Sequence, residues 1–429
     1  MSLREAEIDN NLGLLQRGWR FFSEIILIRS DRPTWTPAIV WTTGACISVA
    51  FAVFVALRLD RLHDLHEVRG WLQYWMSHRG NPYDQFNGDL DYPPVAFLIL
   101  WPLGLPSDAT VAFWYIPAAL AATGLAAWAM LRWMRERMYV TLSTAETVAL
   151  IALMFAGAGS RSGLWQGQTM ALSLMCGALA IRWSRSRPFA AGIALAFCSF
   201  KPHIAVGFGL AILVIEGTDV LVIAAAIVLS LSLLFAATVG QPLTEIIADY
   251  ARNLTLLYAG EERVRGLLSI RFVLDDLIGW YALSTILYAL LAISTLVVIV
   301  VLARRRRHDA VTQAEVAVCC LLWSLMFLPH QLYNSLLAAP ALWLLMWPEA
   351  GLIRRHSWRV AATAAYVLFG VFDVAGAMRL VGTWMPDLNW LYTSSYYLSP
   401  LRIAAIFALI LWGLYHRPHI NTQHTGVRS

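Results

Sequence analysis

Long apolar runs occupy most of this chain and leave little room for a water-soluble fold. Of the 429 residues, 59% are hydrophobic and only 14% are charged, whereas about 25% of the residues of a soluble domain are charged. The runs reach or approach the roughly 20 residues that a helix needs to cross a bilayer. They cover approximately residues 36–57, 109–131, 144–157, 169–181, 189–200, 204–215, 220–239, 281–303, 314–328, 335–347, 360–378 and 401–415. The sequence therefore predicts an all-α polytopic membrane protein.

Clusters of arginine between the apolar runs predict the orientation of the chain. They lie at residues 132–137, 182–187, 304–307 and 354–359. Because positively charged loops remain in the cytoplasm, about twelve transmembrane helices fit, with both termini inside. We expect a cytoplasmic amphipathic segment at residues 1–35, one transmembrane domain at 36–415 and a cytoplasmic tail at 416–429, in a protein of the plasma membrane.

One apolar stretch, residues 94–105, is too short to cross a bilayer comfortably. We expect a re-entrant or steeply tilted element that packs against protein rather than lipid. A short true span is the alternative, and it would place the 132–137 cluster on the wrong side.

The loop between the first two long runs is unusually acidic for so apolar a chain. Ionised carboxylates at a membrane boundary need water, a cation or a catalytic task. Asp64, between His63 and His66, is the strongest catalytic candidate. A solvated loop carboxylate is the alternative interpretation of Asp64, and it applies equally to Asp60, Asp84 and Asp89. The same acidic segment holds Glu67 and Asp91, with Asp108 just beyond.

The predicted topology collects further polar segments on the same outer face. They are residues 165–168, 201–203, 241–280, 329–334 and 382–400. Lys201 is the only lysine of the chain, and an ammonium at the end of a span suits a phosphate. The alternative is a lysine that extends its charged end to the lipid headgroups.

Three other polar residues at these positions have two interpretations each. Gln168 either binds a sugar hydroxyl or orders its glycine-rich loop, where irregular backbone at membrane depth must be buried or line a wet cavity. Arg161 is a second phosphate candidate or a contact to lipid headgroups. His330, at the end of a span, is either catalytic or a structural hydrogen-bonding group.

Several classes of cofactor and partner find no support in the sequence. An H-x-x-H pair in a loop without cysteine partners is weak evidence for zinc, and we expect no metal. Neither a Walker A motif nor GxGxxG is present, so a nucleotide donor has no cradle. The net charge of +5 comes from short arginine clusters between the runs, so we expect no nucleic-acid partner.

A set of short motifs occurs in order along the chain. They are Asp64-Leu65-His66, Gly80-x-Pro82-Tyr83-Asp84, Tyr92-Pro93-Pro94, Trp101-Pro102-Leu103, Gly167-Gln168, Lys201-Pro202, and Pro329-His330 with Tyr333-Asn334. Over roughly residues 40–415, this set resembles the GT-C class of polytopic glycosyltransferases, and within it glycosyltransferase family 87.

The resemblance implies the GT-C fold, with a catalytic aspartate in the first outer loop, and a polyprenyl-phosphate sugar as donor. From this resemblance we expect Asp64 to be catalytic, with His66 and His330 as auxiliaries. We expect the donor phosphate to bind Lys201, Arg161 or Arg265. The substrate contacts that we expect are Tyr83, Asp91, Tyr92, Gln168, His203, Tyr333 and Asn334. Mannose is the expected sugar, and a glycolipid or glycan is the expected acceptor.

The chemistry of such a donor explains why so few groups suffice. A lipid phosphate is its own leaving group, so positive charge rather than a general acid stabilises its departure. One carboxylate then deprotonates the acceptor hydroxyl. One base and one phosphate site predict a single displacement with inversion at the anomeric carbon, without a cofactor.

Other functions remain open at this point. A transporter or flippase of lipid-linked sugars would show inverted repeats and charges near the middle of the bilayer. A ligase that moves a whole oligosaccharide from a lipid diphosphate would have a large outer loop rich in Arg and His. A polyprenyl-phosphate arabinosyltransferase differs only in the sugar.

Overall fold

The part of the chain that the structure describes is helical, and no β-strand forms in it. The structure is a computed structural model. It describes residues 36–56, 62–86, 89–138, 142–258, 267–305, 309–346, 378, 381 and 384–416. The predicted segments 1–35 and 360–377, the tail beyond 416, Asp60 and Arg265 lie outside these ranges.

The helices follow the apolar runs closely where the two can be compared. The first part of the chain forms α2 (Thr36–Ala56), α3 (His63–His78), α4 (Pro82–Gln85), α5 (Pro94–Leu100), η2 (Trp101–Gly104), α6 (Asp108–Met138), α7 (Thr144–Ala156), α8 (Ala158–Gln166), α9 (Met170–Trp183) and α10 (Pro188–Cys198). The second part forms α11 (Pro202–Ile215), α12 (Asp219–Val239), α13 (Leu243–Leu257), α15 (Arg271–Ile278), α16 (Tyr281–Arg305), α17 (Ala310–Phe327), η3 (Leu332–Ala338), α18 (Ala339–Met346), η6 (Pro386–Leu388) and α21 (Asn389–His416).

By length and composition, 4 helices of the described chain can cross a membrane, or up to 5 if the bent pair α7–α8 is one span. They lie in α6, α12, α16 and α21. Shorter apolar helices, among them α9, α10 and α11, accompany them. An all-helical, membrane-like protein is therefore confirmed, while twelve spans and the GT-C fold stay predictions.

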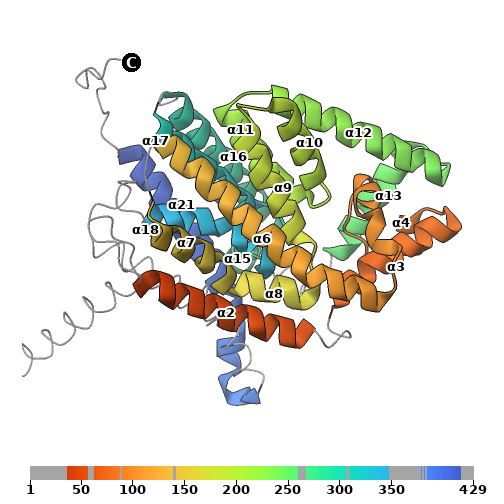
Figure 1. The fold of residues 1–429 in the computed structure, drawn as a ribbon, viewed down its shortest axis with the longest axis horizontal. Helices are drawn as coiled ribbons and strands as arrows, with labels where there is room; N and C mark the ends of the chain where they lie inside the picture. The colour runs from red at the N-terminus through yellow and green to blue at the C-terminus, as the bar shows by residue number, and fades with distance from the viewer. Residues whose placement is uncertain are drawn as a thin grey trace, which may run out of the picture.

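Glycines let the shorter helices pack closely in the middle of the bundle. A Cβ on Gly177 of α9 would overlap the Phe208 ring of α11, and one on Gly192 of α10 would overlap Ile223 of α12. Small residues at such crossings permit the close backbone approach by which membrane helices associate. Successive helices run in opposite directions, so the turns after α8, α10 and α12 lie at one end of the bundle and the turns after α9 and α11 lie at the other (Figure 1).

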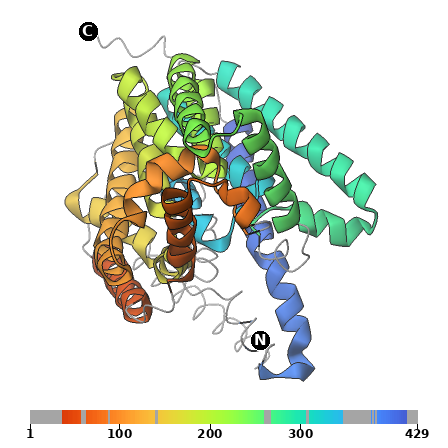
Figure 2. The same ribbon diagram turned by 90° about the vertical axis from the view of Figure 1, so that its right-hand side faces the viewer.

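The acidic segment after α2 is a helix rather than the predicted loop. Within α3, Leu65, Val68, Leu72 and Trp75 are buried, and their spacing of three and four residues places them on one helical face. Together with α4, α5 and α13 this helix forms a lobe at one end of the bundle, seen face on in Figure 2. The lobe has an aromatic core, in which Phe97 of α5 stacks on Phe235 of α12 at 4.8 Å between ring centroids.

Two further segments near the lobe have defined structures. Residues 94–104 form the short helices α5 and η2, and Ala96, Phe97 and Leu100 are buried against protein, as predicted for an element shielded from lipid. The sequence predicted irregular backbone for the glycine-rich segment before Gly167, but this segment is regular. It forms α8, which is bent by 53° from α7.

Candidate active site

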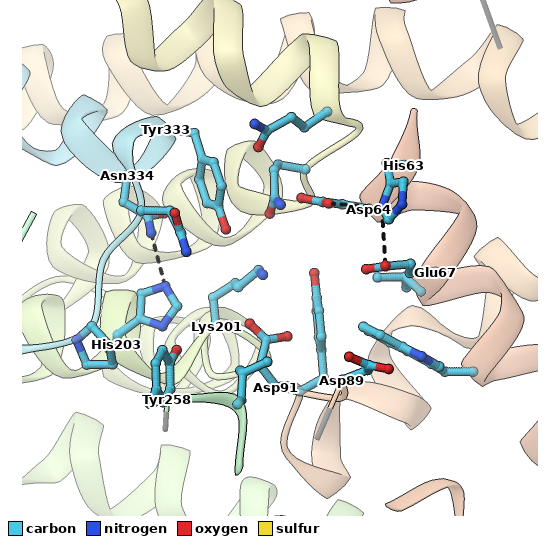
Figure 3. A pocket seen from close by; sticks show the side chains of 18 residues that line it. His63, Asp64, Glu67, Asp89, Asp91, Lys201, His203, Tyr258, Tyr333 and Asn334 are labelled. Atoms are coloured by element: carbon cyan, nitrogen blue, oxygen red, sulfur yellow. Dashed lines mark hydrogen bonds and ion pairs between the residues drawn. The ribbon is translucent and has the colours of Figure 1, made fainter. Parts of the chain in front are cut away.

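A cavity of about 420 Å³ lies where the lobe meets the bundle (Figure 3). Segments that are far apart in the sequence form its walls. They are residues 63–71, 89–92, 166–168, 201–203, 257–258 and 329–334. Polar segments that the sequence predicted to lie together do converge here, while their location on the outer face stays a prediction. The described residues of the last outer segment, 382–400, are not part of this lining.

Asp64 reaches the cavity from the first turn of α3, on the same helical face as Glu67 and Trp71. Its side chain is 29% exposed. Burial raises the pKa of the Asp64 carboxyl to about 6, although the positive charge of Lys201 acts in the opposite direction. A carboxyl with a pKa near 6 is largely ionised at neutral pH and accepts a proton more readily than an ordinary aspartate.

Lys201 lies between α10 and α11 and is 3% exposed. Its ammonium nitrogen lies 4.1 Å from the centroid of the Tyr92 ring, and it points into the cavity with Asp64 and Asp91 on either side (Figure 3). Burial lowers the pKa of Lys201, but Tyr92 and Asp91 raise it more, so the pKa lies well above its usual value. Within the described chain, Lys201 forms no ion pair with a carboxylate.

Hydrogen bonds to two other helices hold the segment that carries Asp91 and Tyr92. The Tyr92 hydroxyl shares a hydrogen bond of 2.8 Å with the Thr169 hydroxyl at the start of α9. Tyr83 donates to the Tyr92 carbonyl at 2.7 Å, and Asn253 of α13 donates to the Tyr83 carbonyl at 2.9 Å. Tyr83 itself is buried and does not line the cavity. It therefore supports Tyr92 from behind.

Gly167 brings the end of α8 against the first turn of α3. Its φ of +75° is left-handed, and a Cβ there would lie 2.7 Å from the Leu65 Cβ. Glycine is favoured for both reasons. The next residue, Gln168, is 5% exposed and lines the cavity. Among the described residues, its side-chain oxygen finds no hydrogen-bond partner.

A cluster of His203, His330 and Asn334 lies on the opposite wall. The Asn334 amide nitrogen lies 3.3 Å from Nε2 of His203, and the two imidazole rings meet nearly at right angles with centroids 4.6 Å apart. His330 is fully buried, and neither ring nitrogen has a hydrogen-bond partner in the part of the chain that the structure describes. Burial lowers its pKa to about 3, so the imidazole is neutral. His203, Tyr333 and Asn334 line the cavity, whereas His330 lies behind them.

The structure does not bring every predicted residue to this cavity. Arg161 donates instead to the Ser48 hydroxyl and to the Ala156 carbonyl, each at 3.2 Å, and is not part of the lining. These bonds to α2 and α7 turn the guanidinium away from the cavity. His66 does not line it either, because it is two residues from Asp64 and so points to a different face of α3.

One group in the described chain has the arrangement to hold a metal ion. Ligand atoms of His63, Asp64 and Glu67 lie within 4.8 Å of one another, and Nδ1 of His63 already lies 3.2 Å from a carboxylate oxygen of Glu67. The three residues lie on one side of α3 because they are one, three or four positions apart in a helix. The H-x-x-H pair of the sequence predicted His66 as the partner of His63, whereas in the structure the partner is Glu67.

Comparison with known protein families decides the class of this site. The model of glycosyltransferase family 87 matches residues 90–329, which is more than half of the chain. The chain belongs to glycosyltransferase family 87. No curated protein and no solved structure matches it. The protein is therefore a glycosyltransferase, and the predicted family and enzyme class are confirmed.

The limits of the family match bear on the individual residues of this glycosyltransferase. The match includes Asp91, Tyr92, Gln168, Lys201 and His203, but it begins after α3 and ends before the 330–334 segment. Asp64 lies outside the matched range, so its assignment to the site rests on its position in the cavity and not on the family match.

Three residues at the candidate site of this family 87 member were not predicted from the sequence. Trp71 lies on the cavity face of α3, seven residues after Asp64, and would have been found had this segment been treated as a helix. Tyr258 lines the cavity from the end of α13. Thr169 holds the Tyr92 hydroxyl, and no sequence pattern indicates that pairing.

Proposed function

We propose that this glycosyltransferase transfers a single sugar, with mannose favoured by the family resemblance, from a polyprenyl-phosphate donor to a glycolipid or glycan acceptor. The reaction inverts the anomeric carbon and takes place on the extracytoplasmic face of the plasma membrane. The observation that carries the proposal is that a carboxylate with a raised pKa, Asp64, and the buried ammonium of Lys201 line one cavity.

The surroundings of Lys201 support an anionic phosphate as its partner. A buried charge is costly unless it is paired, and within the described chain this ammonium has an aromatic face beside it but no ion pair. A phosphodiester in the cavity supplies an anion that pairs with the ammonium directly. As the bond to the sugar breaks, a second negative charge develops on the phosphate, and the ammonium stabilises that charge most.

Asp64 is the proposed general base for the acceptor hydroxyl. The hydroxyl loses its proton to the Asp64 carboxylate while its oxygen attacks the anomeric carbon, and the lipid phosphate leaves with the bonding electrons. One displacement inverts the configuration. Lys201 supplies the positive charge that the leaving group needs, so the proposed reaction uses neither a metal ion nor another cofactor.

Side-chain amides in the cavity wall support a polyhydroxylated substrate. Gln168 and Asn334 line the cavity, and within the described part of the chain their side-chain oxygens have no hydrogen-bond partner. Such atoms cost free energy unless a donor reaches them. Sugar hydroxyls are donors of the right kind, and Asp91, His203 and Tyr333 lie around the same cavity to complete the contacts.

A transfer assay tests the proposed function directly. The purified protein in lipid vesicles receives radiolabelled polyprenyl-phosphate mannose, arabinose or glucose together with a membrane glycolipid extract, with EDTA in a parallel set. We expect label from mannose to enter a glycolipid, with inverted configuration, in wild type but not in Asp64→Asn. Movement of intact donor across the bilayer without transfer would contradict the proposal and indicate a flippase. Loss of transfer in EDTA would contradict the metal-free reaction.

A further inference from the structure

A second cavity, of about 200 Å³, adjoins the polar one and is lined almost entirely by apolar side chains. It lies between η2, the first turns of α6 and the start of α9. We propose that this apolar groove holds the isoprenoid units of the donor nearest the phosphate. The inference rests on the proposed function and assigns a place to the part of the donor that does not react.

Two neighbouring residues connect the wall of the groove to the wall of the proposed site. Gln168 lines both cavities, and its carbonyl accepts a hydrogen bond of 2.8 Å from Tyr115 in the groove wall. Thr169, which also lines the groove, shares a hydrogen bond of 2.8 Å with Tyr92, the ring beside the Lys201 ammonium. A chain that leaves a phosphate at Lys201 therefore meets the groove after one side chain.

The groove is also placed where a lipid can enter it. Its α6 wall belongs to a helix that is long and apolar enough to span a membrane. Trp114 in this wall is 64% exposed, and its neighbour Phe113 is 71% exposed. Tryptophan at the end of a span is typical of the membrane–water interface. Alanines at 118, 119 and 171 leave the space that a hydrocarbon chain fills.

Chemistry distinguishes the donor chain from an acyl chain of the acceptor. The isoprenoid chain is bonded directly to the phosphate, so it must leave the reaction centre beside Lys201. A glycolipid acceptor reaches the same centre with a hydroxyl of its glycan, and that head group separates its acyl chains from the site. The position of the groove beside the lysine fits the donor.

Donors of different chain length test the groove. In Ala118→Trp, an exposed alanine of the groove wall becomes a bulky side chain. We expect the KM for a long-chain polyprenyl-phosphate mannose to rise about tenfold, the loss that corresponds to roughly two buried methylene groups. The KM for a short donor that carries a methyl group on the phosphate in place of the isoprenoid chain should change by less than about twofold. Trp114→Ala, which removes part of the wall, should show the same dependence on chain length.

Matched controls and a binding measurement separate the two proposals. Ala225→Trp makes the same change at an exposed alanine of α12 and should leave both donors unaffected. An equal effect on long and short donors, or a rise only in the acceptor KM, would overturn the groove assignment. A polyprenyl phosphate with a photoreactive diazirine on its first unit needs no catalysis. Crosslinks within residues 102–119 or 168–172 support the groove even if sugar transfer fails, and crosslinks elsewhere contradict it.

Discussion

The ammonium nitrogen of Lys201 lies 4.1 Å from the centroid of the Tyr92 ring, and this buried contact joins the start of α11 to the segment that precedes α5. A cation held over an aromatic face is stabilised without being neutralised. The lysine consequently keeps its full charge for a ligand, while its position is set by a ring that is itself tied to Thr169.

Removal of the Lys201 charge should weaken donor binding. We expect Lys201→Ala to reduce the affinity for polyprenyl-phosphate mannose by about 1.5–3 kcal/mol, the scale of a hydrogen bond to a charged group. Lys201→Arg should restore part of it. Equilibrium binding to the protein in nanodiscs measures the loss, and unchanged affinity in the alanine variant would remove Lys201 from the phosphate site.

Replacement of Asp64 should stop transfer and leave donor binding intact. Asp64→Asn keeps the shape but removes the proton acceptor, so the rate should fall by about 10² to 10⁴. Single-turnover transfer measures the rate, and equilibrium binding checks the donor. Asp60→Asn is the matched control. If that variant is inactive while Asp64→Asn keeps more than about a tenth of the rate, the base is Asp60.

The pH profile of transfer should report the Asp64 carboxyl. Its pKa is raised to about 6, and only the ionised form accepts a proton, so the rate should rise with pH through about 6. Lys201 lowers this pKa in the native protein. Lys201→Met should therefore shift the acidic limb to higher pH, and a limb that stays in place would show that the two groups are not coupled.

Gly167 should tolerate no side chain. Gly167→Ala combines a left-handed φ of +75° with a Cβ 2.7 Å from that of Leu65, and we expect a loss of about 1–3 kcal/mol in the free energy of unfolding together with reduced transfer. Gly240→Ala is the control, because Gly240 has the same φ of +75° but its added Cβ would meet no other side chain or backbone within 4 Å. Equal stability and activity of the two variants would show that the contact with Leu65 is unimportant.

Cysteine labelling should place the two ends of the bundle on opposite sides of the membrane. In a Cys46→Ser background, a membrane-impermeant maleimide added from outside should modify Glu245→Cys on α13 but not Arg187→Cys before α10. Both positions are exposed on the protein, so a difference in labelling would arise because the membrane blocks the reagent from one of them. The reverse pattern would overturn the proposed orientation and the outer location of the site.

The length of the apolar runs was sufficient to predict the helical class, because burying backbone polar groups in lipid leaves helices as the simplest solution. The bounds of α9, α10, α11, α12 and α16 lie close to the predicted runs. The candidates Asp64, Gln168, Lys201 and Asn334 were recognised for a related reason. Polar residues are so rare in an apolar chain that each one at the end of a run stands out.

Tertiary structure alone decided which of these polar residues share a cavity. Arg161 and Lys201 are both basic residues at the same end of the bundle, yet Ser48 and the Ala156 carbonyl hold the arginine away while Tyr92 holds the lysine in the site. The helical form of α3 likewise separated Asp64 from His66 and placed it with Glu67 and Trp71. The sequence by itself determined the membrane-helical class and the short list of polar candidates. Packing between distant segments selected the members of the site, because the direction of a side chain depends on neighbours that no local pattern encodes.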